Sequence, residues 1–184
     1  YFEKMKENYK YIAFSIFLFV SFFIFSQTKT DSLLIQLETC ETQSGKCPDT
    51  AYLKILNNLS MAWVETGDYD KGMHYEKKAL SVAEKVILKG SNHILREMAI
   101  TISNIGYIYY LKENYSQSLK NSLQALRMKE NGSDTLNPIY AATLNHVGLV
   151  YWKMNNDSNA LNYFFASLRV SEKMDYANLA AHCY

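Results

Sequence analysis

Hydrophobic and polar positions alternate with a helical period over residues 102–126. Ile102, Ile105 and Tyr109 recur three or four residues apart, which places them on one face of a helix. Gly106 interrupts this face with a residue that costs a helix interior about 1 kcal/mol relative to alanine. A glycine at such a position predicts that another helix approaches closely there.

A polar break at residues 113–115 ends this first stripe. Leu119, Leu123 and Leu126 then resume a helical spacing. Two helices joined by so short a connection must run antiparallel. One hairpin of this size leaves its apolar face uncovered, so the pattern predicts neighbours of the same kind.

The same pattern occurs three times along the chain. Segments 58–63, 104–109 and 146–151 align, and the breaks at 67–69, 113–115 and 155–157 align in the same register. The aligned positions Ser60, Gly106 and Gly148 are separated by 46 and 42 residues. Self-similarity at a period of this size predicts a solenoid of stacked hairpins.

Large, small and aromatic residues recur at fixed places in each unit. They are Leu56, Leu59, Trp63, Gly67, Tyr69 and Ala79, then Ile102, Gly106, Tyr109, Tyr115 and Ala125, then Leu144, Gly148, Tyr151, Ala160 and Phe164. This arrangement resembles the tetratricopeptide repeat in a long-period form, because the family's usual period is about 34 residues. Glu113 and Asn155 stand where the family has a turn glycine.

The resemblance implies an all-α fold, a right-handed α-solenoid of antiparallel helix hairpins. The repeats are expected at about 50–90, 92–131 and 138–174, with the start of a fourth at 176–184. The sequence begins with Tyr1 and ends within that new apolar stretch, so we expect a segment cut at both ends from a longer protein.

Residues 27–49 are expected to form a short capping helix and a cysteine-containing loop. Leu33, Leu34 and Leu37 would cover the exposed end of the first repeat. Cys40 and Cys47 bracket the loop and form a disulfide or remain two unpaired thiols. A zinc site is disfavoured, because no neighbouring CxxC or histidine pair completes four ligands.

Residues 1–26 have a different composition, with three lysines before an uncharged run at 11–25. A basic start and a short apolar centre predict a secretory signal peptide, and the rival interpretation is an uncleaved N-terminal membrane anchor. A buried solenoid helix is disfavoured, because the run has no polar face. Either favoured interpretation exports the repeats, so we expect a periplasmic or membrane-associated protein with its repeats outside the cytoplasm.

Charge and candidate chemistry narrow the function classes. The chain holds 19 basic and 18 acidic residues, and without a basic stripe nucleic acid is not an expected partner. The histidines are scattered at His74, His93, His146 and His182. No spacing among them predicts a metal site, a catalytic site or a cofactor site. His146 takes the register place of Asn58 and Asn104, which favours a hydrogen-bonded core residue.

The tetratricopeptide resemblance implies that first helices line a concave groove that binds a protein or peptide. The corresponding positions are Asn57, Met61 and Val64, then Ser103, Tyr107 and Tyr110, then Asn145, Leu149 and Trp152. Such side chains favour an apolar or aromatic ligand. The family's terminal-carboxylate clamp is disfavoured, because Met61, Tyr107 and Leu149 replace its asparagine. For Tyr110 and Trp152 the alternative is packing against the second helices.

These features predict a non-catalytic protein-binding scaffold. An export signal, a leucine-rich helix and long-period repeats resemble the front end of bacterial sensor histidine kinases, where the repeats are the extracytoplasmic input. The alternatives are the repeat region of a membrane-linked helix-turn-helix transcription regulator and a stand-alone periplasmic assembly factor.

Overall fold

The computed structural model describes residues 28–42, 47–90, 93–131 and 135–182, and the regular structure in these ranges is α-helical. After a helix over residues 28–42 the elements are α2 (Asp49–Glu65), α3 (Tyr69–Leu88), α4 (Leu95–Leu111), α5 (Tyr115–Asn131), α6 (Pro138–Lys153) and α7 (Asp157–His182). None of the helices in these ranges has the length and apolar character needed to cross a bilayer. The predicted signal or anchor at 1–26 lies outside the described residues.

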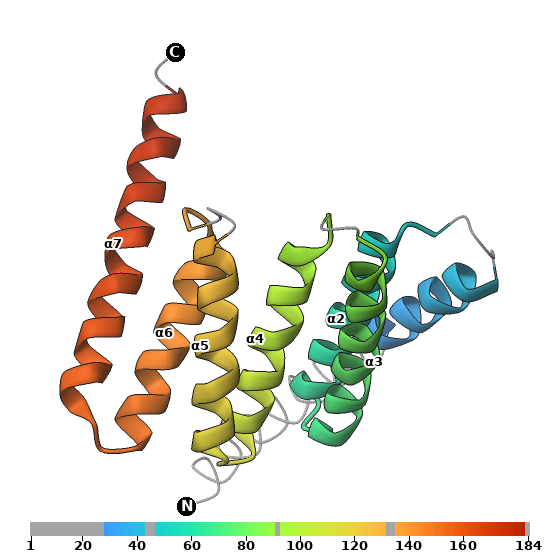
Figure 1. Ribbon diagram of the computed structural model, residues 1–184, viewed down its shortest axis with the longest axis horizontal. Coiled ribbons are helices and arrows are strands. Elements are labelled where there is room, and N and C mark those ends of the chain that lie inside the picture. The colour runs from blue at the N-terminus through green and yellow to red at the C-terminus, as the bar shows by residue number, and fades with distance from the viewer. Residues whose placement is uncertain (1–27, 43–46, 91–92, 132–134, 183–184) are drawn as a thin grey trace, which may run out of the picture.

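The helices form three antiparallel hairpins that stand side by side in a row (Figure 1). Helix α2 pairs with α3, α4 with α5, and α6 with α7. The second helix of each hairpin packs against the first helix of the next, and the first helices α2, α4 and α6 also contact one another in order. This arrangement confirms the predicted all-α solenoid.

The three hairpin turns have the same backbone conformation. Gly67, Glu113 and Asn155 have φ values of 85°, 58° and 56°, so all three lie in the left-handed region. The residue after each donates its N–H to a carbonyl five residues earlier: Asp68 to Trp63, Asn114 to Tyr109, and Asn156 to Tyr151, at 2.8–2.9 Å. The hairpins therefore keep the turn geometry of a glycine where two of them lack one.

In the second and third hairpins the glycine within the helical stripe marks a close helix contact, as predicted for Gly106. A Cβ there would overlap Ser122 Oγ on α5 and lie 3.2 Å from the Ser118 carbonyl oxygen. In the third hairpin a Cβ at Gly148 would lie 2.6 Å from the Phe164 ring. Small residues at this register position therefore set how closely the two helices of a hairpin approach.

The helix at 28–42 caps the first hairpin. Leu33 and Leu37 are buried in one cluster with Leu53 and Leu56 of α2. At one end the Lys29 ammonium contacts a Glu65 carboxylate oxygen at 2.8 Å. At the other, Glu41 accepts hydrogen bonds from Tyr52 at 2.8 Å and Lys78 at 2.6 Å. The helix therefore runs antiparallel to α2.

The structure pairs Cys40 with Cys47 as a disulfide, with Cα atoms 5.2 Å apart. The bond ties the C-terminal end of the capping helix to the segment immediately before α2.

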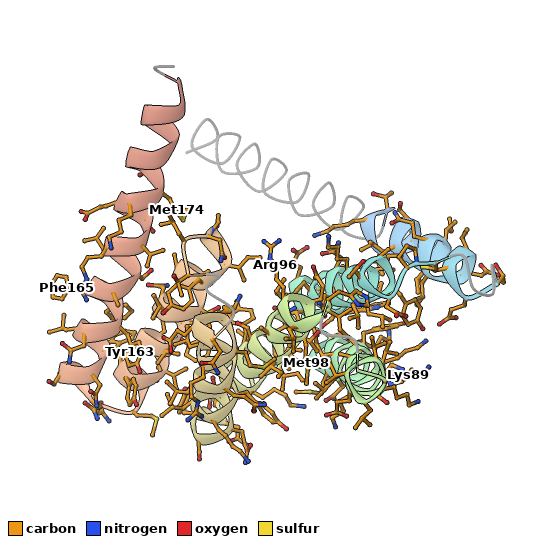
Figure 2. All side chains as sticks on the ribbon, turned by 45° about the horizontal axis from the view of Figure 1, so that its top comes forward. Lys89, Arg96, Met98, Tyr163, Phe165 and Met174 are labelled. Carbon is orange, nitrogen blue, oxygen red and sulfur yellow. A yellow bond between two sulfur atoms is a disulfide. The ribbon has the colours of Figure 1, made fainter. Side chains whose placement is uncertain are left out.

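Helix α7 differs from the expected fourth repeat. Residues 176–182 continue α7 without a break, so they do not begin a new first helix. On this helix Leu161, Phe165 and Leu168 are exposed, and Phe165 points away from the row (Figure 2). The same register positions on α5 are Leu119, Leu123 and Leu126, which pack against α6.

Candidate binding groove

A pocket of about 460 Å³ opens along the first helices of the three hairpins. We call it the inner groove. Five of the predicted groove residues line it: Met61, Ser103, Tyr107, Asn145 and Leu149. Met61, Tyr107 and Leu149 occupy one register position in successive repeats, so each first helix contributes the same place on its surface.

Two predicted groove residues are instead buried. The Asn57 side-chain oxygen accepts a hydrogen bond from the Thr101 hydroxyl at 2.8 Å, which ties α2 to α4. Val64 packs with Ile105 and Ile108 of α4. Its methyl group fills the space beside Gly72, where an added Cβ would approach it to 2.7 Å. Both side chains therefore hold hairpins together and are covered from solvent.

The two remaining predicted residues also lie outside the pocket lining. The Tyr110 ring centroid lies 6.4 Å from that of Tyr107 and 5.9 Å from that of Tyr115, the first residue of α5. For Tyr110 the structure therefore shows the alternative, packing against a second helix. Trp152 is 55 % exposed at the end of α6.

Further lining residues were not among the predicted groove positions, although His146 was expected as a hydrogen-bonded core residue. They are Asn104, Pro138, Ile139, Ala142, Thr143 and His146. The repeat register contained the signal for two of them, because Asn58, Asn104 and His146 align three residues before Met61, Tyr107 and Leu149. The others belong to the first turns of α6, and only the stacking of α6 beside α4 brings them to the groove.

Two lining residues are held from behind by second helices. Asn104 donates its amide N–H to a Glu76 carboxyl oxygen on α3 at 2.8 Å. His146 Nδ1 lies 3.1 Å from Ser122 Oγ on α5. Burial raises the pKa of Glu76 to about 8, and burial lowers the pKa of His146 to about 4. At pH 7 both groups are therefore mainly uncharged.

The inner groove is thus an apolar surface with neutral hydrogen-bonding groups. Its lining combines methionine, tyrosine, leucine, isoleucine and proline with hydroxyl and amide groups, and contains no Lys, Arg, Asp or Glu. The imidazole of His146 adds a ring face, because its two nitrogens lie against Ser118 and Ser122 of α5. In the part of the chain that the structure describes, no cluster of three or more His, Cys, Asp or Glu is placed to hold a metal ion. The geometry supports binding of another molecule through burial and hydrogen bonds.

Comparisons with known proteins agree with this architecture. Two family models, both described as tetratricopeptide repeat, match residues 53–93 and 97–173. A crystal structure of BtubC (BKLC) from P. vanneervenii superimposes with a TM-score of 0.68 at 14 % sequence identity. The match covers 82 % of this chain and 58 % of that one, and the likeness concerns the fold. No curated protein matches the sequence.

Proposed function

We propose that this chain, whose residues 53–93 and 97–173 are tetratricopeptide repeats, is a non-catalytic scaffold that binds a protein or peptide in the inner groove. The observation that carries the proposal is that one pocket is lined by Met61, Tyr107 and Leu149 from three successive first helices. A surface built by three repeats suits a ligand that extends across them.

The chemistry of the lining favours an uncharged ligand segment rich in apolar or aromatic residues. Tyr107, Ile139 and Leu149 offer apolar contact, and such contacts dominate the energy of interfaces. Asn145 offers an exposed amide that suits a peptide backbone, whereas Asn104 has one of its two N–H groups donated to a carboxyl oxygen on α3. A terminal carboxylate would meet no cationic side chain in this lining.

Binding can be tested by selecting peptides from a displayed random library on the 184-residue chain. Ala142 is exposed and lines the groove, so Ala142→Arg should block it without disturbing the core. We expect this variant to weaken the selected peptides by about 10-fold or more. Ser81→Arg, at an exposed position of α3 outside the lining, is the matched control. Failure to select any peptide, or equal affinity for both variants, would contradict the proposal.

For cellular context, the proposal is an exported input region of a larger signalling protein, of the sensor histidine kinase type. The support is the lysine-led apolar run at 11–25 and the pairing of Cys40 with Cys47, which suits an oxidising compartment. Fusion of alkaline phosphatase after Tyr184 tests the export, because that enzyme becomes active only outside the cytoplasm. An inactive but stable fusion would refute export.

A further inference from the structure

A second hollow lies beside the inner groove, between the capping helix 28–42 and α2. Its volume is about 490 Å³, and the lining includes Ser32, Gln36, Asn58 and Met61. Met61 also lines the inner groove. The two hollows therefore meet at one side chain, and together they extend along the capping helix, α2, α4 and α6.

The repeat register supports this continuity. Asn58 lines the second hollow at the position that Asn104 and His146 occupy in the inner groove. The row of polar side chains at this register position therefore runs from His146 on α6 through Asn104 on α4 to Asn58 on α2. There the capping helix forms the opposite wall.

That wall is attached to α2 by buried leucines and to α2 and α3 by ion pairs at its two ends. Leu33 and Leu37 are buried against α2, and their spacing leaves Ser32 and Gln36 exposed on the neighbouring face. The contacts of Lys29 with Glu65, and of Glu41 with Lys78, fix the two ends of the helix. Covering the end of the first hairpin requires only the buried leucines of this helix. The Ser32 hydroxyl and the Gln36 amide are not needed for that role, and they line the second hollow.

The polar groups of this hollow are neutral in sum. The Lys29 ammonium contacts both Glu65 carboxylate oxygens, at 3.0 and 2.8 Å, so the two charges offset each other. The Gln36 amide donates one hydrogen bond to the Ser32 hydroxyl at 3.4 Å. The Gln36 side-chain oxygen and second N–H, and the amide of Asn58, remain for a ligand. A charged ligand side chain would have to compete with an existing ion pair, whereas an uncharged hydrogen-bonding side chain would not.

We propose that helix 28–42 supplies the polar half of one continuous groove, and that the occupant is an extended, uncharged peptide. Its apolar residues lie on α4 and α6, and its Asn, Gln, Ser or Thr residues lie between helix 28–42 and α2. The inference rests on the proposed function and adds the composition and polarity of the ligand. It also makes the capping helix part of the binding site.

The test uses peptides selected from the displayed library on the 184-residue chain. We expect a consensus with an apolar half and an uncharged polar half. Calorimetric titration should show that the double variant Gln36→Ala with Asn58→Ala weakens binding by about 10-fold. Both positions are exposed, so the fold is retained. Glu38→Ala, exposed on the same helix outside the hollow, is the matched control and should leave the affinity unchanged.

The outcomes separate this inference from the proposed function. If Ala142→Arg abolishes binding while the Gln36 and Asn58 double variant does not weaken it, helix 28–42 is only a cap and the inference is wrong. If Ala142→Arg has no effect either, the proposed function fails with it. A tenfold loss on raising the ionic strength from about 0.05 M to about 0.5 M would reveal a charged occupant and overturn the inference.

Discussion

The Asn104 side chain donates a hydrogen bond of 2.8 Å to the fully buried carboxyl group of Glu76. At the next junction His146 takes the place of Asn104, and Ser122 takes that of Glu76, with Nδ1 and Oγ 3.1 Å apart. The second helix of one hairpin is therefore tied to the first helix of the next at the same register position each time. The two junctions use different hydrogen-bonding groups, a carboxyl group in one and an imidazole in the other. Their stability should therefore respond differently to pH.

The junction at Glu76 should weaken as pH rises. The folded-state pKa of about 8 lies above the ordinary value of 4.5 because burial penalises the carboxylate. The folded chain therefore keeps a proton that the unfolded chain releases between these values. The associated stability is complete below pH 4.5 and is lost as pH rises through 8.

Glu76→Gln should remove this dependence. We expect the variant and the parent to differ little in free energy of unfolding at pH 5, and the variant to be the more stable at pH 8 and above. Urea denaturation across this range measures the difference. The exposed Glu84 on the same helix gives the control Glu84→Gln, which should follow the parent. Parallel pH curves for Glu76→Gln and the parent would show that Glu76 does not carry the effect.

The junction at His146 should weaken as pH falls, which is opposite to the junction at Glu76. Burial lowers its folded-state pKa to about 4 from the ordinary 6.5, so the unfolded chain binds a proton that the folded chain excludes. The stability is complete above pH 6.5 and is lost as pH falls through 4. His146→Asn, the residue found at the two equivalent positions, should lose less stability on acidification than the parent. The exposed His74→Asn is the control, and an unchanged acid transition in His146→Asn would contradict the prediction.

Gly106→Ala should destabilise the second hairpin despite the better helix propensity of alanine. The new Cβ would overlap Ser122 Oγ, and overpacking of this kind costs about 1–3 kcal/mol. Thermal and urea denaturation measure the loss. The variant carrying both Gly106→Ala and Ser122→Ala removes the overlapping oxygen, so it should lose less than the sum of the single variants. Strict additivity would show that the contact is not the cause.

Glu113→Gly should stabilise the turn between α4 and α5. Glu113 has a φ of 58°, a conformation that costs most side chains about 1–2 kcal/mol and glycine almost nothing. After the greater entropy of unfolded glycine is subtracted, we expect a gain of about 0.5–1 kcal/mol in free energy of unfolding. Glu113→Ala is the control, because alanine also has a Cβ and incurs a similar conformational cost at this positive φ while removing the charge. A gain of equal size in both variants would assign the effect to charge.

The pairing of Cys40 with Cys47 predicts the number of reactive thiols. The chain has three cysteines, so unfolding without reductant should leave one residue, Cys183, open to alkylation. Mass spectrometry counts the labels, and prior reduction should raise the count to three. Three labels on unreduced protein would reject the disulfide.

The sequence by itself determined the repeated unit. Spacing along a helix is a local property, so the stripes and breaks were sufficient to align Gly67, Glu113 and Asn155, which share one turn geometry. Local crowding likewise requires a small residue wherever two adjacent helices approach closely, so Gly106 by itself predicts that contact.

Only the tertiary structure decided which polar and apolar residues line the groove. One step along an α-helix turns the side chain by about 100°, so the choice between Asn57 and Asn58 depends on how neighbouring hairpins cross. Asn57 meets Thr101, 44 residues away in the chain, and is buried, whereas Asn58 faces the hollow beside the capping helix. Contacts at such separations depend on stacking between repeats, and the helical period of a single repeat carries no information about that stacking.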